Sequence, residues 1–64
     1  MKYAVMQCSN GNFSIAGEWT DLQMAIVNFH SVCTTLWNSP DVKNATVQVV
    51  DEKFTPQKTE YIKY

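Results

Sequence analysis

Two cysteines and one histidine, Cys8, Cys33 and His30, are the side chains in this sequence best suited to nucleophilic or metal chemistry. Zinc needs four protein ligands in a structural site or three in a catalytic one, and the sequence contains no CxxC or HxxxH pair. A catalytic thiol would need a lowered pKa and a base beside it, which the sequence does not clearly supply. We therefore expect no metal and no cofactor, and we expect both cysteines to be core thiols that pack as small apolar side chains.

Acidic residues do not complete a catalytic arrangement either. No acid lies between Asp21 and Asp41, so the segment around His30 lacks a carboxylate that would orient a histidine base. Asp51 and Glu52 are neighbours in a predicted turn, whereas paired-carboxylate chemistry needs two groups that face one another. The sequence also lacks a glycine-rich phosphate loop and a recognisable Ser/His/Asp arrangement. We predict that the protein is not an enzyme and assign no catalytic residue.

The elements that hold these residues form one small domain over residues 1–64, and its first element is a β-hairpin over residues 2–19. Asn10-Gly11 supplies the two positive φ angles that a type I′ turn requires. Centring the turn there gives one mainly apolar face, predicted to face the core, with the pairs Cys8 and Phe13, Met6 and Ile15, Ala4 and Gly17, and Lys2 and Trp19. The reverse face then carries Tyr3 with Glu18, Val5 with Ala16, and Gln7 with Ser14.

A helix is predicted from about Asp21 to Asn38, with Thr20 as its N-cap and Gln23 completing a capping box. Pro40 ends this helix, because the residue before a proline avoids helical backbone angles. At about 100° per residue, one narrow stripe of the helix is apolar and is expected to meet the sheet: Leu22, Ala25, Ile26, Phe29, Cys33 and Leu36.

Two strands are predicted after the helix. The alternation around Val47 predicts a strand over about 44–50, with Ala45, Val47 and Val49 facing inward. Residues 59–64 predict a fourth strand, and residues 54–58, which contain a proline, form either its irregular start or an edge loop. The predicted fold is α+β with the order ββαββ, a four-stranded antiparallel sheet of order 2-1-3-4 and one helix packed on one face.

The outside of the predicted helix is unusual because no Asp, Glu, Lys or Arg occurs from Leu22 to Pro40. Solvated helical faces usually carry several charges, whereas the centres of protein interfaces are depleted in charge. We call the outward residues the outer arc and predict that they form an interface, unless the arc is simply an uncharged exposed surface: Met24, Val27, Asn28, Ser31, Thr34, Thr35 and Asn38.

These features predict a small non-enzymatic binding protein that forms a homo-oligomer, with a dimer as the simplest case. The alternative is a module that holds a nucleotide or a similar small molecule in a pocket between subunits, with His30, Trp37, Tyr3 and Tyr61 as candidate pocket residues. The lesser alternative is a single-stranded nucleic-acid binder that stacks bases on the reverse face of the sheet, which is expected to carry Tyr3, Val5, Ala16, Thr46, Gln48 and Val50.

The charge and hydropathy of the chain limit the classes of partner that it is expected to bind. The net charge is −1, the five cations are scattered lysines and there is no arginine, which argues against a DNA partner. Residues 22–37 contain too many polar side chains to span a membrane, and the first residues lead into a strand pattern rather than a signal peptide. We therefore expect a cytoplasmic protein without a membrane partner.

The helix segments 25–30 and 33–38, followed by Val49-Val50-Asp51-Glu52, resemble short proteins carried by phages and mobile elements of Firmicutes. This resemblance spans about two-thirds of the chain and transfers no catalytic motif. It implies a phage or prophage accessory protein that works inside the host cell. Such a protein would be expected to inhibit or occlude a host factor, including a factor of host defence.

Overall fold

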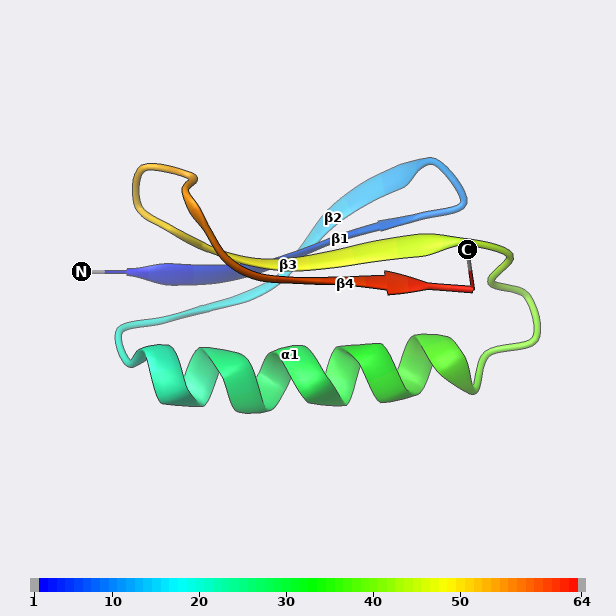
Figure 1. The fold of residues 1–64 in the computed structure, drawn as a ribbon, viewed down its shortest axis with the longest axis horizontal. Helices are drawn as coiled ribbons and strands as arrows, with labels where there is room; N and C mark the ends of the chain where they lie inside the picture. Colours follow the sequence, from blue (N-terminus) through cyan, green and yellow to red (C-terminus); the bar gives the residue numbers. More distant parts are fainter. Residues whose placement is uncertain (1, 64) are drawn as a thin grey trace.

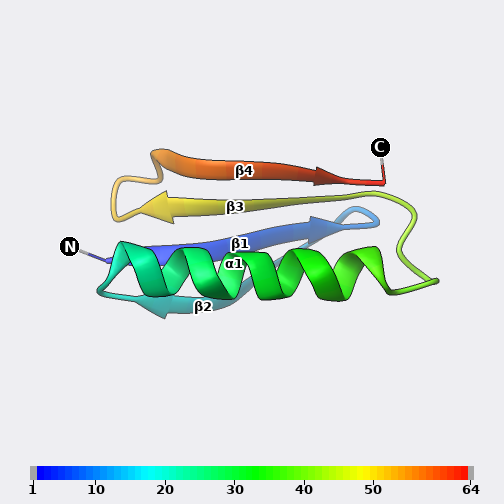
Figure 2. The ribbon, with the colours of Figure 1, turned by 60° about the horizontal axis from the view of Figure 1, so that its bottom comes forward.

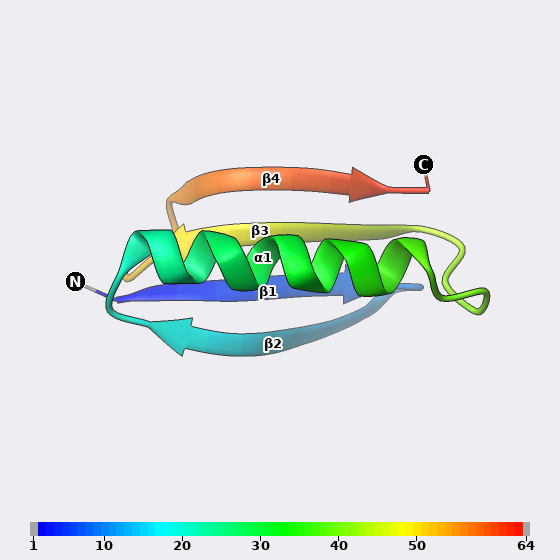
Figure 3. The same ribbon diagram turned by 90° about the horizontal axis from the view of Figure 1, so that it is seen from below.

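A computed structural model describes residues 2–63 of the chain, in which a four-stranded sheet carries one helix. The elements are β1 (Tyr3–Ser9), β2 (Asn12–Trp19), α1 (Leu22–Trp37), β3 (Ala45–Asp51) and β4 (Pro56–Ile62). All neighbouring strands are antiparallel in the order β2-β1-β3-β4, and α1 lies along one face of the sheet (Figures 1 and 2). Seen from the helix side, α1 runs lengthwise over the central strands (Figure 3). The predicted fold class and strand order are confirmed.

The hairpin turn forms at Asn10-Gly11 as predicted, with φ angles of 51° and 84°. Asn10 also binds the connection between α1 and β3, which the sequence did not indicate. Its backbone N–H donates to the Asn44 carbonyl at 3.1 Å, and its Nδ2 donates to the Asp41 carbonyl at 3.0 Å. Its Oδ1 accepts a bond from the Lys43 N–H at 2.9 Å. The turn therefore joins the hairpin tip to a segment more than thirty residues away in sequence.

Replacing Asn10 with glycine is expected to lower the free energy of unfolding by about 1 to 2 kcal/mol, because two side-chain hydrogen bonds are lost. Glycine keeps the positive φ angle, so the loss reports on the bonds and not on the turn. Urea unfolding followed by circular dichroism measures it. Asn12→Ala, at the neighbouring asparagine, is the control and should change stability by less than about 0.5 kcal/mol. Equal effects of the two substitutions would contradict the role given to Asn10.

The register of the hairpin is as predicted near the turn and is wrong beyond it. Cys8 faces Phe13, Met6 faces Ile15 and Gln7 faces Ser14, as expected. Between Val5 and Met6 the register shifts, which leaves Ala16 as an extra residue in a β-bulge of β2. The predicted pairs beyond this point are replaced by Val5 with Gly17, Ala4 with Glu18 and Tyr3 with Trp19.

The predicted core face of β1 is also wrong, because Val5 and not Ala4, Met6 or Cys8 lies under the helix. Val5 is fully buried and faces Val49 of β3, which is fully buried too. Successive side chains of a strand point to opposite sides of the sheet. Ala4, Met6 and Cys8 must therefore point away from the helix. Phe13 and Ile15 of β2 point there with them, since they are paired with Cys8 and Met6.

The bulge gives β2 apolar residues on both sides of the sheet. After the extra residue, Gly17 and Trp19 lie on the helix side, where they were predicted to lie. Gly17 is needed there because a Cβ atom at this position would lie 2.5 Å from Cη2 of the Trp19 ring. The indole therefore folds back over Gly17 and packs against the core beside Tyr3.

The helix and its N-cap each lie one residue later than predicted. Asp21, not Thr20, is the N-cap, and its Oδ1 accepts a bond from the Gln23 N–H at 3.0 Å. The predicted stripe faces the sheet: Ala25, Phe29, Cys33 and Leu36 are buried, and Leu22 and Ile26 pack against them. The predicted inward residues of β3, Ala45, Val47 and Val49, are also confirmed.

The fourth strand spans Pro56–Ile62, whereas 59–64 was predicted, so residues 56–58 form its start and not a loop. Position 64 lies outside the described residues. Pro56 is tolerated because β4 is an edge strand, where a missing backbone N–H removes no necessary ladder bond. The strand pairs with β3 through a second register shift beside Val50. Ile62, near its end, is fully buried and completes the core.

Candidate functional site

The side of the sheet opposite α1 is lined by three rows of side chains that cross all four strands. We call these rows, together with Phe54 beside them, the open face. The rows are Phe13, Cys8, Thr46 and Tyr61; then Ile15, Met6, Gln48 and Thr59; then Glu18, Ala4, Val50 and Pro56. Glu18 is the only charged residue among them. An antiparallel sheet with one solvated face normally places polar residues on that face, so this composition is unusual.

The large apolar side chains of the open face are well exposed. Phe13 is 66% exposed, Ile15 58%, Tyr61 60% and Phe54 72%. Single exposed apolar residues are common on protein surfaces, but a contiguous patch marks a site of interaction. The open face is therefore the main candidate functional surface of the domain. The sequence predicted this side of the sheet as a candidate surface and placed Thr46, Gln48 and Val50 on it correctly. Tyr3 and Val5, which were also expected there, lie on the helix side, and Phe13 and Ile15 were wrongly assigned to the core.

Phe54 has a backbone conformation that large side chains rarely adopt. Its φ angle is 62°, in the left-handed region that favours glycine and asparagine. Asp51 holds this turn: its Oδ1 accepts bonds from the N–H groups of Lys53 and Thr55, and its carbonyl accepts one from Phe54. The turn thus holds the backbone of Phe54, whose ring is exposed, in a conformation that glycine would adopt without strain.

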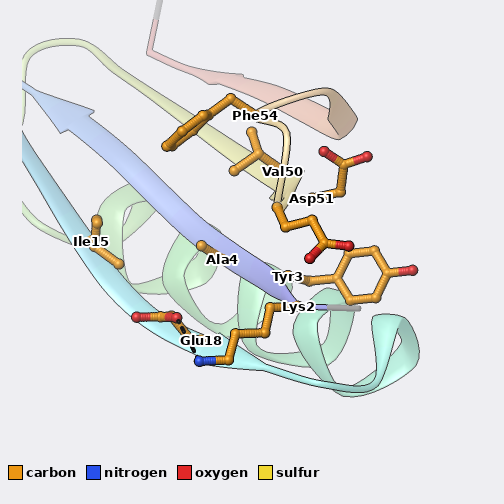
Figure 4. A pocket seen from close by; sticks show the side chains of 9 residues that line it. Lys2, Tyr3, Ala4, Ile15, Glu18, Val50, Asp51 and Phe54 are labelled. Carbon is orange, nitrogen blue, oxygen red and sulfur yellow. Dashed lines mark ion pairs between the residues drawn. The ribbon is translucent and has the colours of Figure 1, made fainter.

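A hollow of about 280 Å³ lies at the third-row end of the open face. Phe54 and Val50 lie on one side of it, the Lys2 and Glu18 side chains lie on the other, and Ala4 lies between them (Figure 4). Lys2 Nζ and Glu18 Oε1 are 3.9 Å apart, with side chains 70% and 61% exposed, so the pair contributes little to stability. The hollow is apolar within, and its rim carries one cation, Lys2, and three carboxylates, those of Glu18, Asp51 and Glu52.

The outer arc lies on the solvent side of α1 as predicted, with Met24 49% and Val27 57% exposed. Four of its five polar side chains are turned back onto the helix. Asn28 Nδ2, Thr34 Oγ1, Thr35 Oγ1 and Asn38 Nδ2 each donate to the carbonyl four residues earlier, at 2.9 to 3.0 Å. Because these donors are used within the helix, the arc offers fewer hydrogen-bond donors to its surroundings than its sequence suggests.

The four candidate pocket residues are not brought together within one chain. His30 and Trp37 lie on exposed positions of α1, where His30 packs edge-on against Phe29 with ring centroids 5.3 Å apart. Tyr3 lines the hollow at one end of the sheet. Tyr61 lies in the first row, at the opposite end of the open face. A shared pocket would therefore need residues from more than one copy.

The two cysteines lie on opposite sides of the sheet, so the placement of Cys8 in the core is wrong. Cys8 is half-buried on the open face, whereas Cys33 lies on the buried side of α1, and both are free thiols. Burial, and secondarily the negative charge of Glu60, raises the pKa of the Cys33 thiol above its ordinary value. A thiol kept protonated in this way is a poor nucleophile.

Among residues 2–63, no three His, Cys, Asp or Glu side chains are grouped so that they could hold a metal ion. No helix in that part of the chain is long and apolar enough to cross a membrane. Comparison with known protein families, with curated proteins and with solved structures gave no match. The candidate site is therefore defined by its geometry and composition alone.

Proposed function

We propose that this domain is a non-enzymatic binding protein whose outer arc is covered by a partner protein. The observation that carries the proposal is the combination of a charge-free helical surface with polar side chains that bond back to their own helix. Covering such a surface removes few hydrogen-bond donors from water and leaves no charge buried without a partner. The free-energy cost of its desolvation is therefore small. Met24 and Val27 supply exposed apolar area within the arc.

The partner in this proposal is a protein of a bacterial host. The support is the resemblance of the helix to short phage and mobile-element proteins, which would place the domain in the host cytoplasm. A domain of this size can act there by covering a functional surface of a host factor, such as a defence protein. It needs no catalytic group for that role.

Introducing a charge at the centre of the arc is expected to abolish partner binding. In Val27→Glu, a carboxylate replaces a side chain that is 57% exposed, so the domain should fold while its complex must desolvate an unpaired charge. The measurement is affinity capture from a Firmicutes lysate, with captured protein quantified per mole of bait. Thr20→Glu adds the same charge outside the arc and serves as the control.

One protein captured in a stoichiometric amount by the wild type and by Thr20→Glu, and lost with Val27→Glu, is the expected result. Retention of that protein by Val27→Glu would show that the arc is not the binding surface. If the wild type captures no protein at a stoichiometric level, the proposal of a host-protein partner fails.

A second candidate function is small-molecule binding, favoured by the hollow beside Phe54. Its apolar interior, with one lysine and three carboxylates at the rim, would accept a small amphipathic molecule that carries a positive charge. A ligand that co-purifies and is lost in Ala4→Trp, which fills the hollow, would support this function. Single-stranded nucleic acid is the weaker candidate, because the rows of the open face offer aromatic rings but no lysine, and the chain has no arginine.

A further inference from the structure

We propose that the open face is a homodimer interface, on which a second copy of the chain packs its own open face. This inference does not depend on the proposed function of the outer arc, which lies on the other side of the domain and stays exposed in such a dimer. The product would be a four-layer assembly, with the two sheets in the middle and one helix on each outside face.

The exposed apolar area is large for so small a protein. Phe13, Tyr61 and Phe54 are each about two-thirds exposed, which leaves on the order of 400 Å² of aromatic surface in contact with water. Ile15 and the half-buried Met6 extend this patch between the rings. A stable interface buries about 800 Å² per partner, roughly a fifth of the 4227 Å² surface of this chain. The rings alone thus supply about half of what a dimer needs.

The charges of the open face suit a copy of itself. A symmetric dimer requires a surface that is complementary to the same surface on its partner. Glu18 is the only charge within the rows, and Lys2 lies beside it with their charged atoms 3.9 Å apart. Asp51 and Glu52 also line the hollow here, so the charges of the open face are gathered at its third-row end. The first row carries no charge, so an arrangement that places the third-row end of each copy over the first row of the other keeps the charges of the two copies apart. The rest of the face is uncharged.

The shape of the open face also suits a two-fold arrangement. An axis that crosses the strands through the middle row, Met6 and Gln48, places the first row of each copy over the third row of the other. The exposed rings of Phe13 and Tyr61 then meet the end of the partner that contains the hollow and Phe54. Aromatic side chains inserted into partner pockets are typical centres of protein interfaces.

The strained backbone of Phe54 is explained by this interface. In an isolated chain, Phe54 is 72% exposed with a φ angle of 62°, so most of its side chain gains nothing from burial to offset the backbone strain. In the dimer, its ring lies at the edge of the buried surface and contacts the partner. The strain in the turn is then offset by association.

The test is the molar mass in solution, measured by light scattering and by sedimentation over a range of concentrations. The wild type is expected at twice the 7.3 kDa of the chain. Ile15→Glu places a charge in the middle row and should give a folded monomer, as checked by circular dichroism. Val27→Glu, the matched charge on the outer arc, should remain a dimer.

Phe54→Gly is the second variant, since it removes the ring and relieves the positive φ angle together. It is expected to weaken the dimer at least tenfold while the monomer melts at the same or a higher temperature than the wild-type monomer. A wild type that stays monomeric at millimolar concentration would overturn the proposal. So would a dimer that Ile15→Glu and Phe54→Gly leave intact, or one that Val27→Glu separates while Ile15→Glu does not.

Discussion

Replacing Phe29 with alanine is expected to lower the free energy of unfolding by about 3 to 5 kcal/mol. Phe29 is fully buried in the core, where it packs among residues of α1, β1 and β3. A domain of 64 residues has a total stability of only about 3 to 10 kcal/mol, so the loss is a large share of it. Urea unfolding followed by circular dichroism should show a midpoint shifted to much lower urea, or no folded baseline.

Trp37→Ala is the control for this substitution, because it also removes a large aromatic ring from α1. Trp37 is 51% exposed at the end of the helix, so its loss should cost no more than about 1 kcal/mol. Similar effects of the two substitutions would show that Phe29 is not the centre of the core.

Val5→Asp is expected to prevent folding, with a loss of more than about 4 kcal/mol. Val5 is fully buried opposite Val49, and a carboxylate there would lie between the sheet and α1 without a cation to pair with. Circular dichroism and the dispersion of amide signals in an NMR spectrum would show an unfolded chain. This substitution tests which side of β1 is the core.

Met6→Asp, one position further along the same strand, is expected to fold. Its side chain points to the open face, where a carboxylate can reach water in the isolated chain. The homodimer proposal adds that Met6→Asp should be monomeric. A folded Val5→Asp together with an unfolded Met6→Asp would mean that the sequence-based choice of core face was right and that the observed register is wrong.

The features that could be predicted from the sequence are those that depend on local chemistry. Asn10-Gly11 determines the turn, the apolar stripe of residues 22–36 determines the buried side of α1, and β-branched alternation determines β3. The strand order followed because short connections favour antiparallel neighbours. Each of these signals lies within a window of a few residues and needs no knowledge of distant contacts.

The core side of the hairpin could not be predicted in the same way, because both sides of β1 carry apolar residues. The choice is made by β3, whose buried Val49 is paired with Val5, and by the close contact of Trp19 with Gly17. The bulge at Ala16 leaves no local signal in the sequence, since alanine has no special preference for it. Without the bulge, the alternation of β2 assigns Phe13 and Gly17 to one face.

The candidate site was predicted only in part for the same reason. Predicting the outer arc requires helical periodicity alone, and the structure places Met24 and Val27 on the exposed side of α1 as expected. Which residues form the open face depends on the sheet register. Because the register of the hairpin was predicted without the bulge, Phe13 and Ile15 were assigned to the core instead. Phe54 was missed because its positive φ angle follows from the turn that Asp51 holds, and phenylalanine gives no hint of it.

The two irregular edges of the sheet limit how copies of this protein can aggregate. An edge strand with free backbone groups is a template for adding further strands, and repeated addition leads to fibrils. β4 starts at Pro56, which cannot donate a hydrogen bond, and β2 is bent by its bulge. Growth in the plane of the sheet is therefore disfavoured on both sides. The apolar open face can then associate only with the open face of a second copy in the proposed dimer. That association ends after two chains and does not lead to fibrils.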